Sequence, residues 1–306
     1  MPVLLNLDFF ARRDNFEPPA KPLADARGSV CAMPHRGRIK SVSAAFLLLA
    51  VFTFRSDLWA QGNGNPPAFP PDSVVNSANS SPTSLTPNVL ATLSGSNLAS
   101  STASAVATGS GALPTLLAGV RVIVGGIFAS LLYVSPTKVN FIMPASLLPG
   151  QTNIVLVRDF IVTPTAQITL LDAAPALFVD NPDNSRIAAQ HADGSLISPD
   201  APAHPGEVIV VYGTGLGRTD PTQIDGSIPR SLAPIVLLNQ LQVLLDGQPV
   251  PVENILYAGI APGFAGLYQI NLRLPTEIGA TPEIRVAMGD QMSQSSLRFQ
   301  VATDGP

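Results

Sequence analysis

The sequence repeats itself over a distance long enough to hold several strands. Residues 87–98 return without a gap as residues 205–216, 118 positions later. Residues 138–144 return as residues 269–275, 131 positions later. A repeat of this length is a whole small domain rather than one unit of a solenoid. The chain is therefore predicted to contain two similar domains.

Short apolar runs bounded by turn residues predict the class of both domains. Charged residues make up only 12% of the chain, whereas it has 30 prolines and 24 glycines. Runs rich in Val, Ile and Leu and bounded by Gly, Pro, Asn or Asp are typical of strands. Such runs cover 89–93, 120–124, 127–134, 138–143, 153–157 and 166–171 in the first copy, and 208–212, 241–245, 250–257, 267–274, 283–288 and 296–301 in the second. An all-β fold of two antiparallel β-sandwiches follows.

The N-terminal region has the pattern of a secretory signal peptide. Three basic residues precede an apolar run over 42–54, and Ala60 ends the segment that follows it. This order predicts export to an extracellular, periplasmic or cell-surface location. The alternative is a retained anchor, because Arg55 and Asp57 interrupt the usual cleavage region. Met33 lies just before the basic residues and is the alternative start of the protein.

Composition and the repeat divide the chain into five parts. The predicted organisation is an N-terminal extension and signal peptide over 1–60, a disordered linker over 61–72, a first β-sandwich over 73–172, a Pro-rich junction with a small hairpin over 173–204, and a second β-sandwich over 205–303. Four prolines restrict the junction. Its apolar side chains Leu177 and Phe178 are expected to be buried, so that the two domains move largely as one.

Charge and cysteine content exclude several classes of partner and chemistry. The only cysteine is Cys31, so the chain after Ala60 holds no disulfide or thiolate. That part of the chain carries nine Lys and Arg against sixteen Asp and Glu. Without a basic stripe, nucleic acid is not an expected partner. Contact with a membrane is expected only through the signal segment, if it is not cleaved.

Glycine and asparagine recur at the end of the first strong strand in each copy. Gly95 and Gly213 end these strands, and Asn97 and Gly215 follow two positions later. Gly and Asn best tolerate positive φ, which predicts a left-handed turn at the second position. The rival interpretation is a phosphate-binding loop over 213–217. It lacks a third glycine in the required place and a following helix, since a proline comes four residues later.

Two asparagines stand inside apolar strands that end at proline. Asn140 and Asn271 occupy matching positions in the two copies. A buried amide has to be hydrogen-bonded, so both are interpreted as structural residues that satisfy backbone groups where the strand leaves the sheet.

The order of these motifs resembles a family of secreted bacterial proteins, the Solibacter-type uncharacterised C-terminal domain family. The matching segments are residues 74–79, 95–98, 132–136, 174–178, 205–217 and 266–271. Lys138 departs from the glutamine usual at that position. The strand ends at 95–98 and 213–216 also resemble the IPT/TIG branch of immunoglobulin-like folds. The resemblance implies two tandem IPT/TIG-like β-sandwiches and export, and it implies no catalytic residue.

Catalytic and metal-binding patterns are not evident. His191 and His204 are the two histidines after Ala60, whereas a zinc site or a catalytic triad needs a cluster of partners. Asp180 and Asp183 are weak candidates for a calcium site, because they lack the order of an EF-hand loop. We expect no enzyme activity and no cofactor.

A binding or adhesion module of unknown ligand is the function that these features favour. The expected partner is an extracellular protein or a polysaccharide. The candidate faces are the longest unrepeated segments, over 99–115, 218–234 and 258–266, with Phe264 as a weak candidate for ligand contact. A structural spacer or surface-assembly component is the alternative. A hydrolase is a third hypothesis, and it would require a pocket that holds His191 with an acid and a nucleophile.

Overall fold

Regular structure in the protein is almost entirely β-strand. The computed structural model describes residues 65–108, 111–181 and 185–302. Within these ranges the helical segments are single 3-10 turns: η2 (Pro71–Ser73), η3 (Leu238–Gln240) and η4 (Val252–Asn254). The predicted signal segment over 1–60 lies outside the described residues. Within the described ranges, no helix has the length and apolar character needed to cross a membrane.

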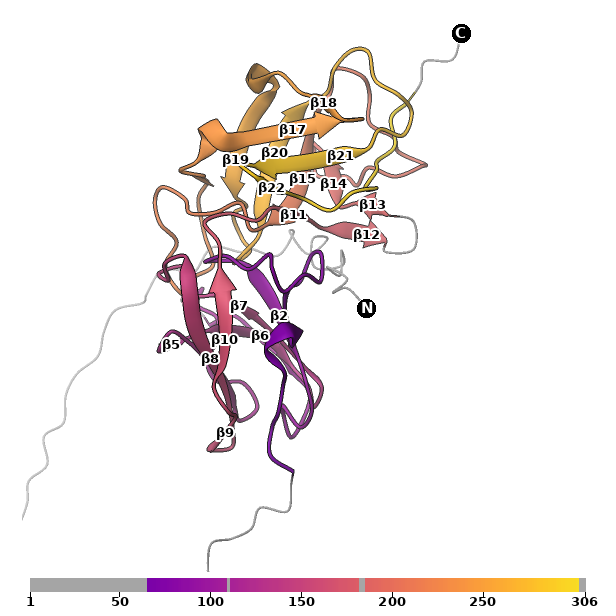
Figure 1. Ribbon diagram of the computed structural model, residues 1–306. Helices are drawn as coiled ribbons and strands as arrows, with labels where there is room; N and C mark the ends of the chain where they lie inside the picture. Colours follow the sequence, from indigo (N-terminus) through magenta and orange to yellow (C-terminus); the bar gives the residue numbers. More distant parts are fainter. Residues whose placement is uncertain (1–64, 109–110, 182–184, 303–306) are drawn as a thin grey trace, which may run out of the picture. The chain divides into compact units, whose positions relative to one another are not determined.

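The first copy forms two antiparallel sheets that pack on one core (Figure 1). One sheet has the order β1 (Val74–Asn76), β2 (Leu90–Ser94), β7 (Lys138–Ile142), β6 (Ser130–Val134) and β3 (Ala103–Ser104). The other has the order β10 (Ala166–Leu170), β8 (Gly150–Arg158), β4 (Val120–Val124) and β5 (Ile127–Phe128), with β9 (Ile161–Val162) paired to β8.

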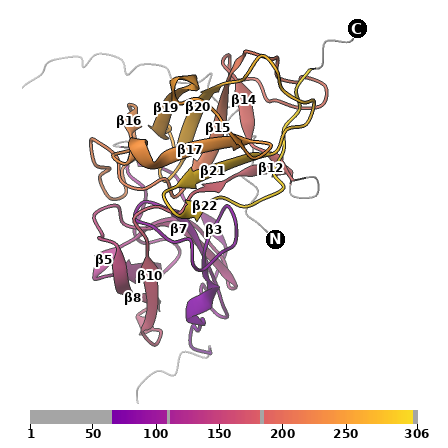
Figure 2. The ribbon, with the colours of Figure 1, turned by 45° about the horizontal axis from the view of Figure 1, so that its top comes forward.

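The second copy repeats this topology (Figure 2). One sheet has the order β11 (Ala176–Leu177), β15 (Val208–Thr214), β20 (Tyr268–Arg273), β19 (Ile255–Ile260) and β16 (Ala233–Pro234), with β14 (Ala189–His191) also paired to β15. The other has the order β18 (Gln248–Pro249), β17 (Leu241–Leu245), β21 (Ile284–Met288) and β22 (Gln291–Met292). A separate pair joins β12 (Val179–Asn181) to β13 (Arg186–Ile187). The prediction of an all-β protein with two β-sandwiches is confirmed.

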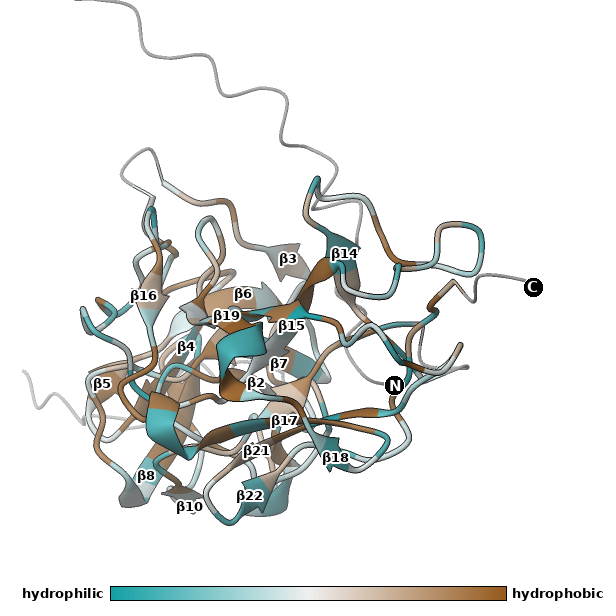
Figure 3. Cartoon of the chain, turned by 90° about the horizontal axis from the view of Figure 1, so that it is seen from above, coloured by the Kyte–Doolittle hydropathy of each residue, from teal (hydrophilic) through white to brown (hydrophobic). Residues whose placement is uncertain are grey.

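Alternation of side chains explains why these runs form half-buried strands. Along β4 and β10, buried residues alternate with more exposed ones, as the two-residue period of a strand requires. In Figure 3 the edge strand β18 is drawn toward the hydrophilic end of the scale, whereas hydrophobic colour lies along β17. Short polar edges of this kind discourage pairing with other chains.

Several turns have a left-handed backbone. Gly125-Gly126 and Asp246-Gly247 join β4 to β5 and β17 to β18, and all four residues have positive φ. Such turns match the twist of a hairpin. Asn97 and Gly215 have φ of 54° and 78°, in the left-handed region predicted for them. Leu98 and Leu216, which follow them, are buried in the two cores.

Gly95 and Gly213 serve a different purpose from the left-handed positions. A Cβ on Gly95 would overlap the carbonyl oxygen of Ala68, and one on Gly213 would lie 2.8 Å from the carbonyl oxygen of Ala176. Each glycine therefore allows a preceding segment to approach the strand closely. Ala68 bridges Ser96, and Ala176 pairs with Thr214.

Two segments that were predicted as a linker and as a junction contribute to the sheets. From Asn65 onward, the segment predicted as linker over 61–72 is structured, because Ala68 bridges Ser96 and Phe69 packs against the first core. Within the region predicted as a junction, β11 and β14 pair with β15 of the second sandwich. Leu177 and Phe178 are buried, as predicted.

Three predicted strands differ from the structure. The run over 127–134 divides into β5 and β6, which belong to different sheets. The run over 250–257 is interrupted by η4, because Pro251 cannot donate to a sheet and the strand β19 begins only at Ile255. The run over 296–301 forms isolated bridges at Arg298 and Val301 rather than a continuous strand.

Buried hydroxyl groups join the two sandwiches, which belong to one compact unit. The Thr214 hydroxyl donates to the carbonyl oxygen of Gly266 at 2.8 Å and accepts from the backbone N–H of Leu90 at 3.2 Å. A Cβ on Gly266 would lie 2.8 Å from the Cδ1 atom of Ile142, so the two copies are in close contact here.

Tyr268 makes a second buried connection. Its hydroxyl donates to the carbonyl oxygen of Gly217 at 2.6 Å and accepts from Nδ2 of Asn88, in the first copy, at 3.2 Å. Burial raises the pKa of Tyr268 to about 12, although the hydrogen bond from Asn88 opposes this shift. The hydroxyl therefore stays protonated and keeps its role as a donor.

A carboxylate and a short backbone pairing complete the contact. Asp225 Oδ1 accepts from the backbone N–H groups of Ala145 and Ser146, and Oδ2 accepts from the Ser146 hydroxyl. The N–H of Leu113 donates to the carbonyl oxygen of Gly226 at 2.7 Å. These contacts use loops of both copies and fix the two sandwiches to each other.

Candidate functional site

Uncharged polar side chains gather on the outer face of strands β8 and β10 in the first sandwich. We call Gln151, Asn153, Gln167 and Thr169 the polar patch. All four are exposed, whereas the residues that alternate with them on β10 point into the core. The strand period therefore places the whole patch on one face of the sheet.

Sheet register brings these side chains together in pairs. Gln167 lies opposite Asn153, and Thr169 lies opposite Gln151. Directly opposed side chains in an antiparallel pair have Cβ atoms about 5 Å apart. Within the described residues, these four side chains make no hydrogen bond to another protein group. Each amide offers both a donor and an acceptor, so the patch presents a close array of both.

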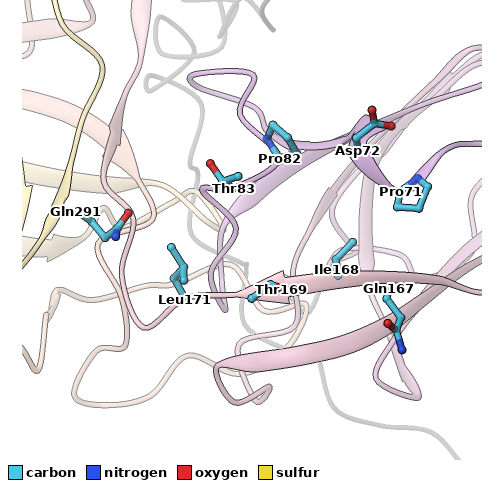
Figure 4. Close-up of a pocket in the computed structure, with 9 residues that line it drawn as sticks. All are labelled: Pro71, Asp72, Pro82, Thr83, Gln167, Ile168, Thr169, Leu171 and Gln291. Atoms are coloured by element: carbon cyan, nitrogen blue, oxygen red, sulfur yellow. The ribbon is translucent and has the colours of Figure 1, made fainter.

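Two open hollows flank the patch and share Gln167. One, of about 450 Å³, is lined by Pro71, Asp72, Pro82, Thr83, Gln167, Ile168, Thr169, Leu171 and Gln291 (Figure 4). The other, of about 500 Å³, is lined by Gly125, Gly126, Gln151, Thr152, Asn153 and Gln167. Asp72 is the single ionisable residue in these two sets. Both hollows are therefore suited to uncharged polar molecules.

An apolar and aromatic surface continues the same face. Val155 and Val157 follow the patch along β8, and Ile123 of β4 lies opposite Val155. Phe128 of β5 is 47% exposed, and the Arg121 guanidinium lies 5.0 Å from the centre of its ring. The face thus combines hydrogen-bonding groups with an exposed ring that can pack against an apolar surface.

The sequence did not single out the patch, although one signal was present. Exposed polar residues alternate with apolar residues over 166–170, which identifies a solvent-facing side of a strand. That pattern alone is shared by ordinary solvated strands. Only the pairing of β8 with β10 brings the three amides and the hydroxyl into one array.

The residue that the sequence did single out for ligand contact lies elsewhere, and the two asparagines that were interpreted as structural have other partners than expected. Phe264 is half-buried in the loop between β19 and β20. Asn140 and Asn271 lie within β7 and β20, and their partners are side chains rather than the backbone groups expected. Asn140 Oδ1 accepts from the Thr92 hydroxyl at 3.1 Å, and Asn271 Oδ1 accepts from Gln269 Nε2 at 2.9 Å.

Only one of the two weak calcium candidates, Asp180, lies within the described residues. Asp180 Oδ2 accepts from Arg186 Nε at 2.5 Å, so this carboxylate is already paired with a cation. Asp183 lies outside the described residues. Within the ranges that the structure describes, no three His, Cys, Asp or Glu residues form a group that could hold a metal ion.

His191 is held by two acceptors. Its Nδ1 lies 2.6 Å from Glu207 Oε1, and its Nε2 lies 3.3 Å from the carbonyl oxygen of Ala201. Burial by itself would lower the pKa of His191, but the bond to Glu207, the Ala201 carbonyl and the charges of Glu207 and Asp193 together raise it above its ordinary value. Both neighbours are acceptors, so each ring nitrogen is placed to donate, and the protonated ring forms an ion pair with Glu207.

Comparisons with known proteins found only distant likenesses among solved structures. No protein-family model and no curated protein matches the chain. A surface glycan-binding protein of Prevotella bryantii is similar at a TM-score of 0.25 and 14% identity, over 77% of this chain and 42% of that protein. A Bacteroides ovatus surface glycan-binding protein, solved with a mixed-linkage heptasaccharide, is similar at a TM-score of 0.30 and 14% identity. This likeness covers 78% of this chain and 47% of that protein.

An S-layer protein fragment, domains 5–6 of SbsC, is similar at a TM-score of 0.23 and 11% identity, over 78% of this chain and 100% of the fragment. The chain spans less than half the length of the two glycan-binding proteins. At these scores the likenesses support no functional inference.

Proposed function

We propose that the protein is an exported, non-enzymatic binding module that holds an uncharged polysaccharide on the polar patch of the first sandwich. The polar patch carries the proposal: three amides and one hydroxyl that face outward in register, without protein partners. Membership of the family that the sequence motifs resemble is part of the same proposal.

The chemistry of the face favours a neutral sugar chain. A sugar ring offers neighbouring hydroxyl groups around its rim, and each amide of the patch can donate to one hydroxyl and accept from another. Its C–H faces are apolar and suit Val155, Val157 and the exposed Phe128 ring. An anionic polymer would need cations, but the side chains of the patch carry none.

Loss of two amides tests the proposal. We expect Asn153→Ala combined with Gln167→Ala to weaken binding to neutral polysaccharides by about 10- to 100-fold, because each neutral hydrogen bond contributes about 0.5–1.5 kcal/mol. Gln242→Ala on β17 is the matched control, since Gln242 is also an exposed strand amide. Binding is measured by affinity electrophoresis in a panel of soluble neutral polysaccharides. Retardation that is equal in both variants would contradict the proposal.

A structural spacer is the second candidate, and the contact between the sandwiches favours it. Buried hydrogen bonds of Thr214 and Tyr268 fix one sandwich to the other. A spacer needs such rigidity, because its role is to hold other parts at a set distance rather than to bind a ligand. The two candidates differ in one observation. A spacer gives no signal on a glycan array and captures no protein from the producing cells, whereas the proposed module binds neutral glycans on the array.

A further inference from the structure

The hairpin tip between β8 and β9 exposes consecutive apolar side chains. Phe160 is fully exposed, and Ile161 and Val162 are 37% and 58% exposed. Single exposed apolar residues are ordinary on protein surfaces. Three consecutive exposed apolar residues at the end of a hairpin form a local apolar surface, which is typical of an interaction site. We call residues 159–162 the apolar tip.

Backbone strain shows that the tip is not optimised for folding. Asp159 and Phe160 have φ of 48° and 69°, a region that favours glycine and asparagine. At the matching turn of the second copy, between β21 and β22, Gly289 takes the positive φ and Asp290 follows it. A bulky residue in this region costs about 1–2 kcal/mol. Phe160 is fully exposed, so packing within the protein does not offset that cost.

The tip is held firmly despite this strain. The N–H of Asp159 donates to the carbonyl oxygen of Gly119 at 3.0 Å, and the Ser100 hydroxyl donates to Asp159 Oδ2 at 2.7 Å. Arg158 is buried, and its guanidinium donates to the carbonyl oxygens of Asn97 and Asn65. The backbone at the start of the tip is therefore fixed, so a partner does not have to order it.

The same arginine ties the tip to the point where the chain enters the fold. Asn65, whose carbonyl oxygen accepts from Arg158, follows the apolar run over 42–54 after ten residues. Ten residues span at most about 35 Å. A lipid bilayer that takes up this run therefore lies within reach of the apolar tip.

The charged groups around the tip already have partners. Asn97 and Ser100 beside it are uncharged, and the Arg158 guanidinium donates to two carbonyl oxygens. Arg121, across β8 from Val162, lies over the Phe128 ring. The Asp159 carboxylate already accepts a hydrogen bond from Ser100. Contact with lipid would thus bury apolar groups without removing water from a cluster of charges, which is the costly step in such a contact.

We propose that the apolar tip inserts into the surface of a lipid bilayer to which the N-terminal apolar run delivers the chain. The site goes beyond polysaccharide binding and lies apart from the polar patch. Gln151 and Arg158 are near opposite ends of the nine-residue strand β8, which is about 30 Å long. A sandwich that contacts lipid through the tip therefore keeps its polar patch available to solvent.

Thiol labelling of the full chain tests this insertion. Cys31→Ser removes the only cysteine, and Val162→Cys or Leu148→Cys then introduces one label site. Leu148 is 71% exposed and precedes the other end of β8, so it is the matched control. On floated phosphatidylcholine vesicles, we expect a membrane-impermeant maleimide to react at least fivefold more slowly at position 162 than in free solution. Position 148 should keep its rate, and an unchanged rate at position 162 would overturn the proposal.

Two further measurements separate insertion into lipid from contact between copies of the chain. Phe160→Gly relieves the strained turn, so it should not lower the thermal stability, yet we expect it to restore fast labelling at position 162 on vesicles. Protection that persists in this variant contradicts insertion by the tip. If the labelling rate at position 162 is already low without vesicles and falls further as the protein concentration rises, the tip is in contact with other copies of the chain. That result also overturns the proposal. Polysaccharide binding is expected to be unchanged in all of these variants.

Discussion

The β14, β15 and β20 sheet of the second sandwich and the polar patch of the first both carry amides on the side away from the core, but they use them differently. In the second sandwich the Tyr212 hydroxyl donates to Gln190 Oε1 at 2.8 Å, and Gln269 donates to Asn271. In the first, the amides of the polar patch face solvent without partners among the described residues. The same residue type therefore stabilises one sheet and leaves the other available for a ligand. Amino-acid composition does not distinguish these two roles, whereas the register of the paired strands does, because it decides which side chains lie next to each amide.

The comparison extends to hydroxyl groups. Thr214 and Tyr268 of the second copy are buried and bonded across the contact between the sandwiches, whereas Thr169 of the first is exposed. Substitutions in the second copy should therefore change the free energy of unfolding, and those in the polar patch should change binding alone.

The largest expected effect is at Thr214. Thr214→Val keeps the shape of the side chain but leaves the N–H of Leu90 and the carbonyl oxygen of Gly266 without this partner. We expect a loss of about 2–3 kcal/mol in the free energy of unfolding, because each buried unsatisfied group costs about 1–3 kcal/mol. Urea unfolding measures it, with exposed Thr169→Val as the control. Equal losses in the two variants would remove the distinction between the copies.

Tyr268 should give the next largest effect. Tyr268→Phe removes the hydroxyl that joins Gly217 to Asn88, with an expected loss of about 1–2 kcal/mol. Tyr133→Phe, on a half-buried tyrosine of β6, serves as the control and should lose less than about 0.5 kcal/mol, the range of ordinary surface changes. Thermal unfolding followed by circular dichroism compares the two. A larger loss in the control would show that the Tyr268 hydroxyl is dispensable.

A smaller effect should depend on pH. The folded protein raises the pKa of His191 through its bonds to Glu207 and Ala201, so the folded state binds the proton more tightly than the unfolded state. This contribution is complete below the unfolded pKa of about 6.5 and is lost as the pH rises through the folded pKa. We expect a decline of up to about 1 kcal/mol between pH 6 and pH 9. His191→Gln should remove that decline in urea titrations, and a parallel decline in the variant would assign it to other groups.

The smallest effect compares two glutamines directly. Gln269→Ala breaks the bond to Asn271 and should cost about 0.5 kcal/mol, whereas Gln167→Ala should leave the free energy of unfolding unchanged within about 0.3 kcal/mol. Guanidinium unfolding of both variants under one condition measures the difference. A greater loss at Gln167 than at Gln269 would reverse the assignment of roles.

Local patterns were sufficient to predict much of the fold. The strands over 120–124 and 241–245 were predicted with their observed bounds, because apolar alternation and a following turn of two residues define both ends. The prediction for 250–257 was wrong where Pro251 interrupts the strand. Pairing of β11 and β14 with β15 was left open by the sequence, since strand partners depend on contacts between distant residues.

The candidate sites were harder to predict than the fold. Phe264 was chosen because glycines flank it, yet it is half-buried, whereas Phe160 is fully exposed. Asp159 is a common turn residue, but Phe160 stands where glycine usually follows it, so the local sequence did not indicate that this phenylalanine ends a hairpin. The polar patch depends on the register of β8 and β10, which is a property of the folded sheet.

The short passage from β10 to β11 has a mechanical consequence. Five residues separate the end of β10 at Leu170 from the start of β11 at Ala176, and they span at most about 17 Å. Tension applied to the two ends of the chain therefore reaches the contact between the sandwiches with little slack to absorb it. The bonds of Thr214, Tyr268 and Asp225 would bear load together with the sheets, so the pair should resist extension as one element rather than opening first at a hinge.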